Sequence, residues 1–172
     1  MSCLLTSGAT RQCAHEFGGL KELYIANFSE VESVDVSPTT GEATGFTMMS
    51  TGATFYSFEF LKDTAQALEE LQDGPSSFIQ QTINFQLNGI TLAKRDVLNE
   101  LSLGTFVVIA KKPDDKFWVY GVPASSIGLE ATTDNIDSGA ATSDISSATL
   151  SMVGPSTAYA ITATDAAVAA VI

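Results

Sequence analysis

The stretch FIQQTINFQLNG, residues 78–89, separates into two lists when every second residue is read. One list is apolar apart from Gln81 and contains Ile79, Ile83, Phe85 and Leu87. The other list, after Phe78, carries amides and a hydroxyl but no charge: Gln80, Thr82, Asn84 and Gln86. Because side chains alternate across a strand, this pattern predicts a β-strand with one apolar face and one uncharged polar face.

The composition predicts one globular domain over residues 1–172. Hydrophobic residues make up 45% and charged residues only 16%, against roughly 25% charged residues in ordinary soluble domains. Such a chain either hides much of its surface in an assembly or has a surface rich in Ser and Thr. The net charge of -12 disfavours a protein that reads DNA sequence, but it suits a surface that DNA passes without adhering.

We expect neither a signal peptide nor a membrane-spanning helix. The opening MSCLLTSGATRQCAHEFGG, residues 1–19, has no basic start followed by an apolar run. No segment reaches the ~18–20 apolar residues that a spanning helix needs. Residues 1–19 are therefore predicted to form an N-terminal arm, and the closing DAAVAAVI, residues 165–172, is predicted to be a docked end or a final strand.

Candidate metal ligands are too few or too widely spaced to predict a metal site. Structural zinc sites use four ligands with close cysteine spacing, whereas the candidates here are only Cys3, Cys13 and His15. A disulfide between the two cysteines is sterically possible, but because the chain shows no sign of secretion we expect two reduced thiols. A calcium loop needs alternating Asp residues followed by Gly, and that pattern is absent around the three candidates Asp134, Asp137 and Asp144.

No motif for catalysis or for nucleotide binding occurs in the chain. The single histidine, His15, would have to act from the N-terminal arm, and no nucleophile elbow, P-loop or dinucleotide fingerprint is present. We therefore expect the protein not to be an enzyme and to use no cofactor.

Most of the remaining signals are those of β-strands. Strands are predicted over residues 20–28, 31–36, 53–61, 105–112, 116–122, 148–154 and 157–164. Residues 105–122 have the pattern of a β-hairpin, and residues 123–147 are a Ser/Thr/Asp/Gly-rich stretch without a predicted element. Residues 63–74 are compatible with a helical turn or a loop.

One helix is predicted over residues 92–101. Thr91 is a suitable N-cap, and Gly104 stops the helix soon after its end. Its apolar stripe consists of Ala93, Val97, Leu98 and Leu101.

The order of these signals carries a resemblance to a known family. The stretches concerned are MSCLLTSGATRQC (1–13), HEFGGLKELYIANFSEV (15–31), FYSFEF (55–60), FIQQTINFQLNGI (78–90), LAKRDVLNEL (92–101), TFVVIAKKPDDKFWVYGV (105–122) and SATLSMVG (147–154). In this order they resemble tail tube proteins of tailed bacteriophages, in particular short chains of Bacteroidetes phages, including crAss-like ones. The resemblance covers most of the chain, but not residues 123–147 or the segment after Thr164.

The resemblance implies a mainly β fold, a β-sandwich or barrel of two packed antiparallel sheets with one flanking α-helix. It also implies a virion structural protein, made in the host cytoplasm, whose hexameric rings stack into a tail tube and contact other tail and neck proteins. DNA would pass through the channel without specific binding. The polar face of the first strand, Gln80, Thr82, Asn84 and Gln86, would line the channel or pack at a subunit joint, where lone charges are costly to desolvate.

Two further surfaces are expected to take part in such an assembly. The candidate for a loop that docks onto the next ring is SPTTGEATGFTMMSTG, residues 37–52, in which the contact candidates are Pro38, Thr39, Thr40, Gly41, Glu42, Met48 and Met49. An ordinary hairpin is the alternative for this segment. Trp118 and Tyr120 are candidate subunit contacts, since aromatic residues are common at interfaces.

Two other functions stay open. A single-ring head–tail connector, a tail-completion protein or a capsid decoration protein would share this pattern. A carbohydrate-binding β-sandwich would use Trp118 and Tyr120 as exposed aromatic residues, with Phe117 and Val119 facing the core.

Overall fold

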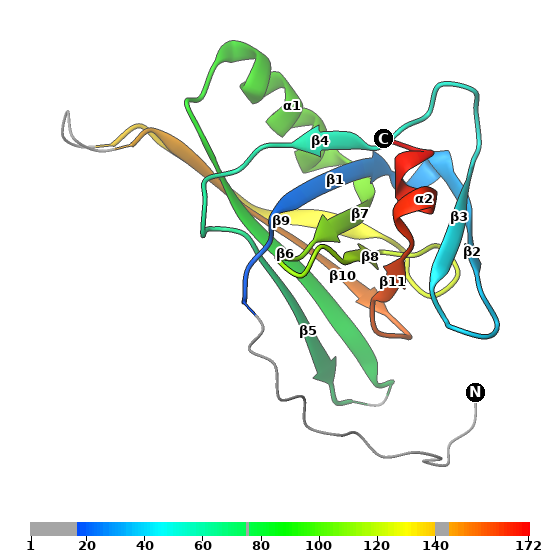
Figure 1. The fold of residues 1–172 in the computed structure, drawn as a ribbon. Helices are drawn as coiled ribbons and strands as arrows, with labels where there is room; N and C mark the ends of the chain where they lie inside the picture. Colours follow the sequence, from blue (N-terminus) through cyan, green and yellow to red (C-terminus); the bar gives the residue numbers. More distant parts are fainter. Residues whose placement is uncertain (1–16, 75, 140–144) are drawn as a thin grey trace.

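Residues 78–88 form β6 (Phe78–Asn88), and the first layer of the fold is built around this strand (Figure 1). The computed structural model describes residues 17–74, 76–139 and 145–172. Strand β6 pairs antiparallel with β5 (Gln66–Gln72) on one side and with β10 (Ser147–Ser156) on the other. β10 in turn pairs antiparallel with β9 (Leu129–Asp137).

A second layer packs against the first. Its strands are β1 (Glu22–Asn27), β4 (Tyr56–Phe58), β7 (Thr105–Lys111), β8 (Phe117–Tyr120) and β11 (Ile161–Ala163). The start of β9 pairs with the start of β7, so both layers belong to one continuous sheet that folds over itself. The hairpin of β2 (Val31–Val36) and β3 (Ala43–Met48) joins through a parallel pair between β3 and β11, whereas the other strand pairs are antiparallel.

Two helices accompany the sheet. Helix α1 (Leu92–Leu103) lies on the flank of the sandwich, and the Thr91 hydroxyl accepts a hydrogen bond of 3.3 Å from the Lys94 amide, which confirms the predicted N-cap. The C-terminal segment contains the short helix α2 (Asp165–Ala169), and it buries Val168 of this helix and Val171 after the helix. It is therefore a docked end and not a final strand. A 3-10 turn covers Phe28–Glu30.

The predicted fold class is confirmed, because the protein is mainly β, with sheet layers packed face to face and a helix on the flank. The structure adds one parallel strand pair and the second helix α2, neither of which the resemblance implied. The predicted hairpin over residues 105–122 is also present, as β7 and β8.

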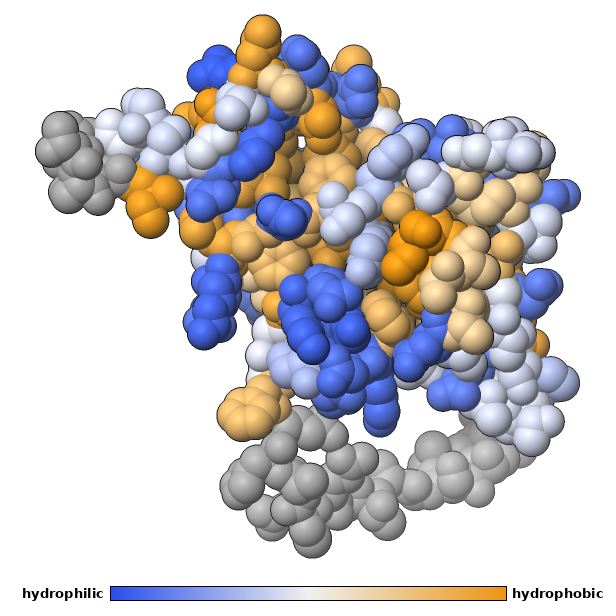
Figure 2. All heavy atoms as spheres, turned by 45° about the horizontal axis from the view of Figure 1, so that its top comes forward, coloured by the Kyte–Doolittle hydropathy of each residue, from blue (hydrophilic) through white to orange (hydrophobic). Residues whose placement is uncertain are grey.

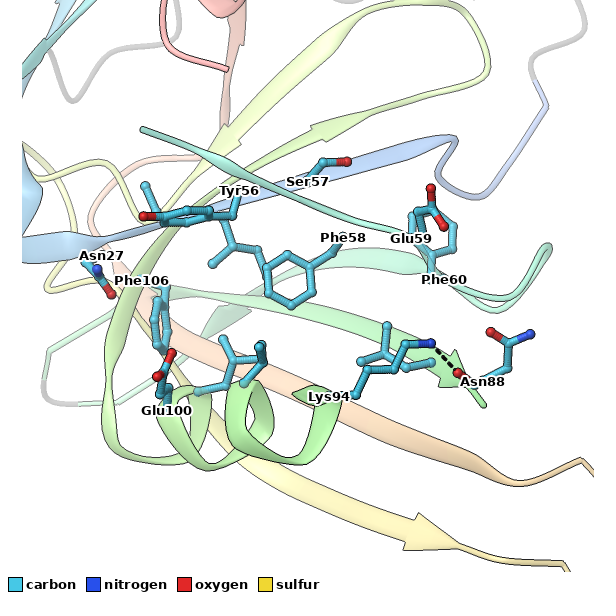
Figure 3. Close-up of a pocket in the computed structure, with 15 residues that line it drawn as sticks. Asn27, Tyr56, Ser57, Phe58, Glu59, Phe60, Asn88, Lys94, Glu100 and Phe106 are labelled. Atoms are coloured by element: carbon cyan, nitrogen blue, oxygen red, sulfur yellow. Dashed lines mark hydrogen bonds between the residues drawn. The ribbon is translucent and has the colours of Figure 1, made fainter. Parts of the chain in front are cut away.

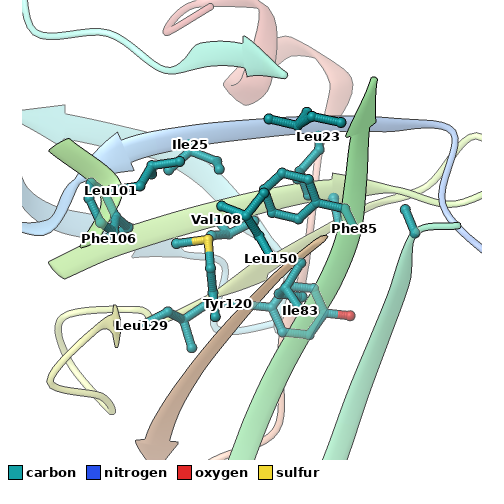
Figure 4. Packing of buried hydrophobic residues seen from close by; sticks show 14 of the residues in the cluster. Leu23, Ile25, Ile83, Phe85, Leu101, Phe106, Val108, Tyr120, Leu129 and Leu150 are labelled. Carbon is teal, nitrogen blue, oxygen red and sulfur yellow. The ribbon is translucent and has the colours of Figure 1, made fainter. Parts of the chain in front are cut away.

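The hydrophobic core has two parts, one on each face of β7. Phe106, Val108 and Ala110 face the first part, between β7 and the β6 layer (Figure 4). Val107 and Ile109 face the second part, which the β2–β3 hairpin and α2 cover. The alternation along β7 thus places a buried side chain on both faces, as in strands enclosed between two layers.

Gln81, the polar exception on the apolar side of β6, is buried with 2% of its surface exposed. Its Oε1 accepts a hydrogen bond of 2.9 Å from the Gly121 amide, and its Nε2 donates to Glu69 Oε1 at 3.2 Å and to the Ala158 carbonyl at 3.4 Å. Glu69 Oε1 also accepts from the Ala160 amide at 2.5 Å. A buried polar group is tolerated when it is hydrogen-bonded, and this one links β5, β6, the end of β8 and the turn after β10.

Several predicted segments differ from the structure. Residues 63–74 contain strand β5, so both alternatives for that segment, a helical turn and a loop, were wrong. Strand β9 lies within residues 123–147, where no element was predicted. Only three residues of each predicted strand at 53–61 and 157–164 are strand, namely β4 and β11. In all these segments pairing with a distant strand, and not local sequence pattern, determines the structure.

Replacing Gln81 by leucine should lower the free energy of unfolding by about 1–3 kcal/mol, because the buried Gly121 amide and the Glu69 carboxylate would each lose a partner. Urea unfolding of the purified protein measures this change. Gln80→Leu is the matched control, since Gln80 lies next in sequence but on the outer face, and its effect should stay within about 0.5 kcal/mol. Equal effects of the two substitutions would contradict the assigned role of Gln81.

Candidate functional site

The outer face of the first layer carries the polar side chains that the sequence placed on one side of β6. Gln80, Thr82, Asn84 and Gln86 all lie on this face and are half-buried. Gln86 Nε2 donates a hydrogen bond of 2.7 Å to Ser147 Oγ on β10. Thr149 and Ser151, which lie opposite Gln86 and Asn84, extend the face over β10. The structure therefore brings the predicted residues together on one face, where Thr82 and Gln80 lie opposite the apolar residues Val153 and Pro155 of β10.

Charge on this outer face is confined to its margins. Strands β6 and β10 contain no charged residue. The strand registers place Glu70 of β5 beside Gln80, and Glu130 and Asp137 of β9 beside Val153 and Ser147 of β10. The face is thus an uncharged strip, polar over β6 and partly apolar over β10, and it is flanked by carboxylates that would repel a polyanion.

The main strand order of the sheet ends in the two edge strands β2 and β5, which differ in their protection, and β4 has a further edge without a strand partner in the described part of the chain. The β2–β3 ladder has two register shifts, and β2 exposes the charged residues Glu32 and Asp35. Bulges and charges of this kind discourage edge-to-edge pairing. The β5–β6 ladder is regular over Gln66–Gln72, and β5 exposes Leu68, Glu70 and Leu71, the last with 65% of its surface accessible. β5 is therefore the more regular of these two edges, and sequence reasoning missed it because the strand itself was not predicted.

A groove of about 950 Å³ lies between β4, β1 and helix α1 (Figure 3). Its apolar lining comes from residues distant in sequence, namely Ile25, Tyr56, Phe58, Phe60, Leu87, Val97, Leu101 and Phe106. Of the predicted apolar stripe of α1, only Leu98 and Leu101 are buried, while Ala93 is exposed and Val97 faces the groove. The aromatic run FYSFEF, residues 55–60, was predicted from sequence only as part of a strand. Its aromatic residues were the sequence feature that could have indicated an apolar groove at this place.

Tyr120 is not available to a partner, contrary to the expectation that it forms a subunit contact or a sugar platform. It is a core residue with 2% of its surface exposed. Phe117 and Val119 of the same strand point into the other part of the core, so β8 is buried on both faces apart from Trp118. The Trp118 ring is half-buried and is covered by Lys112, whose Nζ lies 4.0 Å from the ring centroid.

Residues 37–52 do not form a single long loop. Residues 43–48 are strand β3, so the segment is a hairpin turn, a strand and a second turn. The alternative of an ordinary hairpin describes its structure. Met48 packs against the core, and Met49 is exposed, as are the turn residues Pro38, Thr39, Thr40 and Gly41, while Glu42 is half-buried.

The candidate zinc ligands Cys3, Cys13 and His15 lie outside the described residues, as does Asp144. Within the described ranges, no group of three or more His, Cys, Asp or Glu side chains is placed to hold a metal ion. In the same part of the chain, no helix is long and apolar enough to span a membrane.

Comparison of this chain with protein-family models, with curated proteins and with solved structures found no match.

Burial raises the pKa of Tyr120 above its ordinary value of 10.0, and the Glu69 carboxylate acts in the same direction. The unfolded chain should therefore lose this proton first, so the free energy of unfolding should fall as the pH rises above about 10. Tyr120→Phe should make that fall less steep. Urea unfolding of both proteins on either side of this pH measures the difference, and identical pH dependence would contradict the buried position of Tyr120.

Proposed function

We propose that this chain is a structural protein of a tailed-phage virion whose copies form rings that stack into a tail tube. The proposal combines the family resemblance, which supplies the hexameric ring, with one observation. The outer face of the first layer is uncharged over β6 and β10, and this layer ends in the regular edge strand β5. A sheet with these two properties can be extended by a neighbouring copy and can present its polar face to water.

The polar outer face is the surface that would line the channel. Half-buried hydroxyls and amides such as Thr82 and Asn84 interact with water without attracting phosphates, and the flanking carboxylates repel them. DNA would thus pass without specific binding. Exposed leucines on β5 would be covered at the joint between copies.

Pairing of the β5 edge with a different edge of the next copy is a head-to-tail contact. Such contacts close into a ring when the rotation between copies permits it. Pairing of β5 with β5 of another copy would instead give a two-fold dimer. The ring proposal therefore requires that β5 meets another part of the neighbouring copy.

A single-ring connector or tail-completion protein would use the same surfaces, and the length of the assembly distinguishes it from a tube. The carbohydrate-binding alternative loses its proposed platform, because Tyr120 is buried in the core and Lys112 covers Trp118.

Negative-stain electron microscopy with mass photometry of the purified chain tests the proposal. Hollow tubes are expected, single rings would assign the connector role, and dimers or monomers at high concentration would contradict ring formation.

Leu71→Lys should raise the critical concentration for assembly at least tenfold, because a charge on an edge strand opposes pairing. Leu103→Lys, at an exposed position of α1, is the matched control and should assemble normally.

Labelling of a cysteine at position 84 tests whether the polar face lines the channel. In a background with Cys3→Ser and Cys13→Ser, Asn84→Cys should react with a small maleimide in the assembled state, but not with a maleimide on a bulky polymer. Reaction with neither reagent would place Asn84 at a subunit joint, and reaction with both would place it outside. Asn99→Cys on the exposed side of α1 is the control for an open position.

A further inference from the structure

The groove between β4 and α1 lies beside an unpaired strand edge. β4 pairs with β1 through Tyr56–Phe58, and within the described residues no strand pairs with its other edge. Helix α1 lies across the groove from β4, as Figure 3 shows. A space between a free strand edge and a helix is the geometry in which an extended peptide adds to a sheet, with backbone hydrogen bonds on one side and side-chain contacts on the other.

The floor and walls of the groove are apolar and partly open to the surface. Tyr56 has 56% and Val97 has 38% of its surface exposed, whereas Leu101 and Phe106 are buried at the base. Phe58 is held by an edge-to-face contact with the core residue Phe85, at 6.2 Å between ring centroids. Figure 2 shows apolar side chains, coloured orange and tan, exposed in a hollow beside the helix. The groove thus offers a preformed apolar surface to alternate side chains of an added strand.

The charges along the groove indicate the chemistry of its occupant. Glu59 and Glu100 are exposed near opposite ends of the groove, and neither takes part in an ion pair within the described part of the chain. The cation that lines the groove, Lys94, donates its Nζ hydrogen bond to the Asn88 carbonyl at 2.5 Å. An occupant that carries basic residues at its two ends would therefore meet two unneutralised carboxylates.

We propose that this groove binds an extended segment of another protein, which pairs with the free edge of β4. The segment has apolar side chains at alternate positions, directed into the groove, and a basic residue near each end, directed at Glu59 and Glu100. This inference does not depend on ring formation, because the groove lies apart from the polar face and from β5.

Isothermal titration calorimetry with synthetic peptides tests the proposal. The peptide KVTVTVK, capped at both ends, should bind the full-length chain, and EVTVTVE, with the same apolar residues and acidic ends, should bind at least tenfold more weakly. Equal affinities, or no binding of KVTVTVK, would overturn the charge and shape assigned to the occupant.

Two N-methylated peptides test whether the backbone pairs with β4. In an added strand, alternate amides face the partner strand, so methylation of either the valine amides or the threonine amides should abolish binding, while methylation of the other set should leave binding intact. If both forms bind equally, or both fail, the segment does not pair as a strand and the proposal is wrong.

Matched protein variants locate the site. Glu100→Gln should weaken KVTVTVK binding by about two- to fivefold, the range of one exposed ion pair. Asp96→Asn removes the same charge from an exposed position of the same helix outside the groove and should leave binding unchanged. Equal effects of the two variants would show general electrostatic attraction and overturn the site.

A second copy of this chain is the alternative occupant of the groove. In that case the peptide would compete with self-association of the protein, and this result would also overturn the proposal.

Discussion

Strand β7 has no face open to solvent, and the layered arrangement of the protein follows from that constraint. Its five central residues, from Phe106 to Ala110, are buried on alternating sides. Burial of a large apolar side chain stabilises a fold by about 1.5–3 kcal/mol, so both faces of β7 need a cover. The β6 layer and α1 cover one face, and the β2–β3 hairpin and α2 cover the other. Only the outermost surfaces are then left for contacts with other molecules.

One face of the β6 layer packs against β7, and the other face does not contribute to the core. On the inner face of β6 the polar side chain of Gln81 joins four segments by hydrogen bonds, and one of them is the edge strand β5 through Glu69. This bonding fixes the position of β5 on β6, and with it the register of the whole outer face. A slip of one residue in the pairing of β5 and β6 would turn the polar face inward. The hydrogen bonds of Gln81 and the neutral outer face therefore depend on the same register.

The sequence predicted the elements whose local pattern is strong. β6 alternates over its full length, β7 and β8 are apolar runs around a turn, and α1 begins at the cap residue Thr91. β5 and β9 were not predicted, because they have little apolar alternation and become strands by pairing with β6 and β10. Tyr120 was assigned to the surface because four apolar residues in β8 do not reveal that both faces are covered. The polar face was therefore predictable, whereas the groove was not, since five separate segments form it.

The contrast between the strands β2 and β5 bears on the ring that we propose. At the β2 end, register shifts and the exposed acids Glu32 and Asp35 make strand addition unfavourable. At the β5 end, the regular ladder and the exposed Leu71 favour it. An edge that is blocked cannot accept the β5 edge of a neighbouring copy, so β5 would pair either with β5 of another copy, which gives a two-fold dimer, or with a surface other than β2. The ring that we propose requires the second arrangement, because only a contact between two different surfaces passes from copy to copy around a ring.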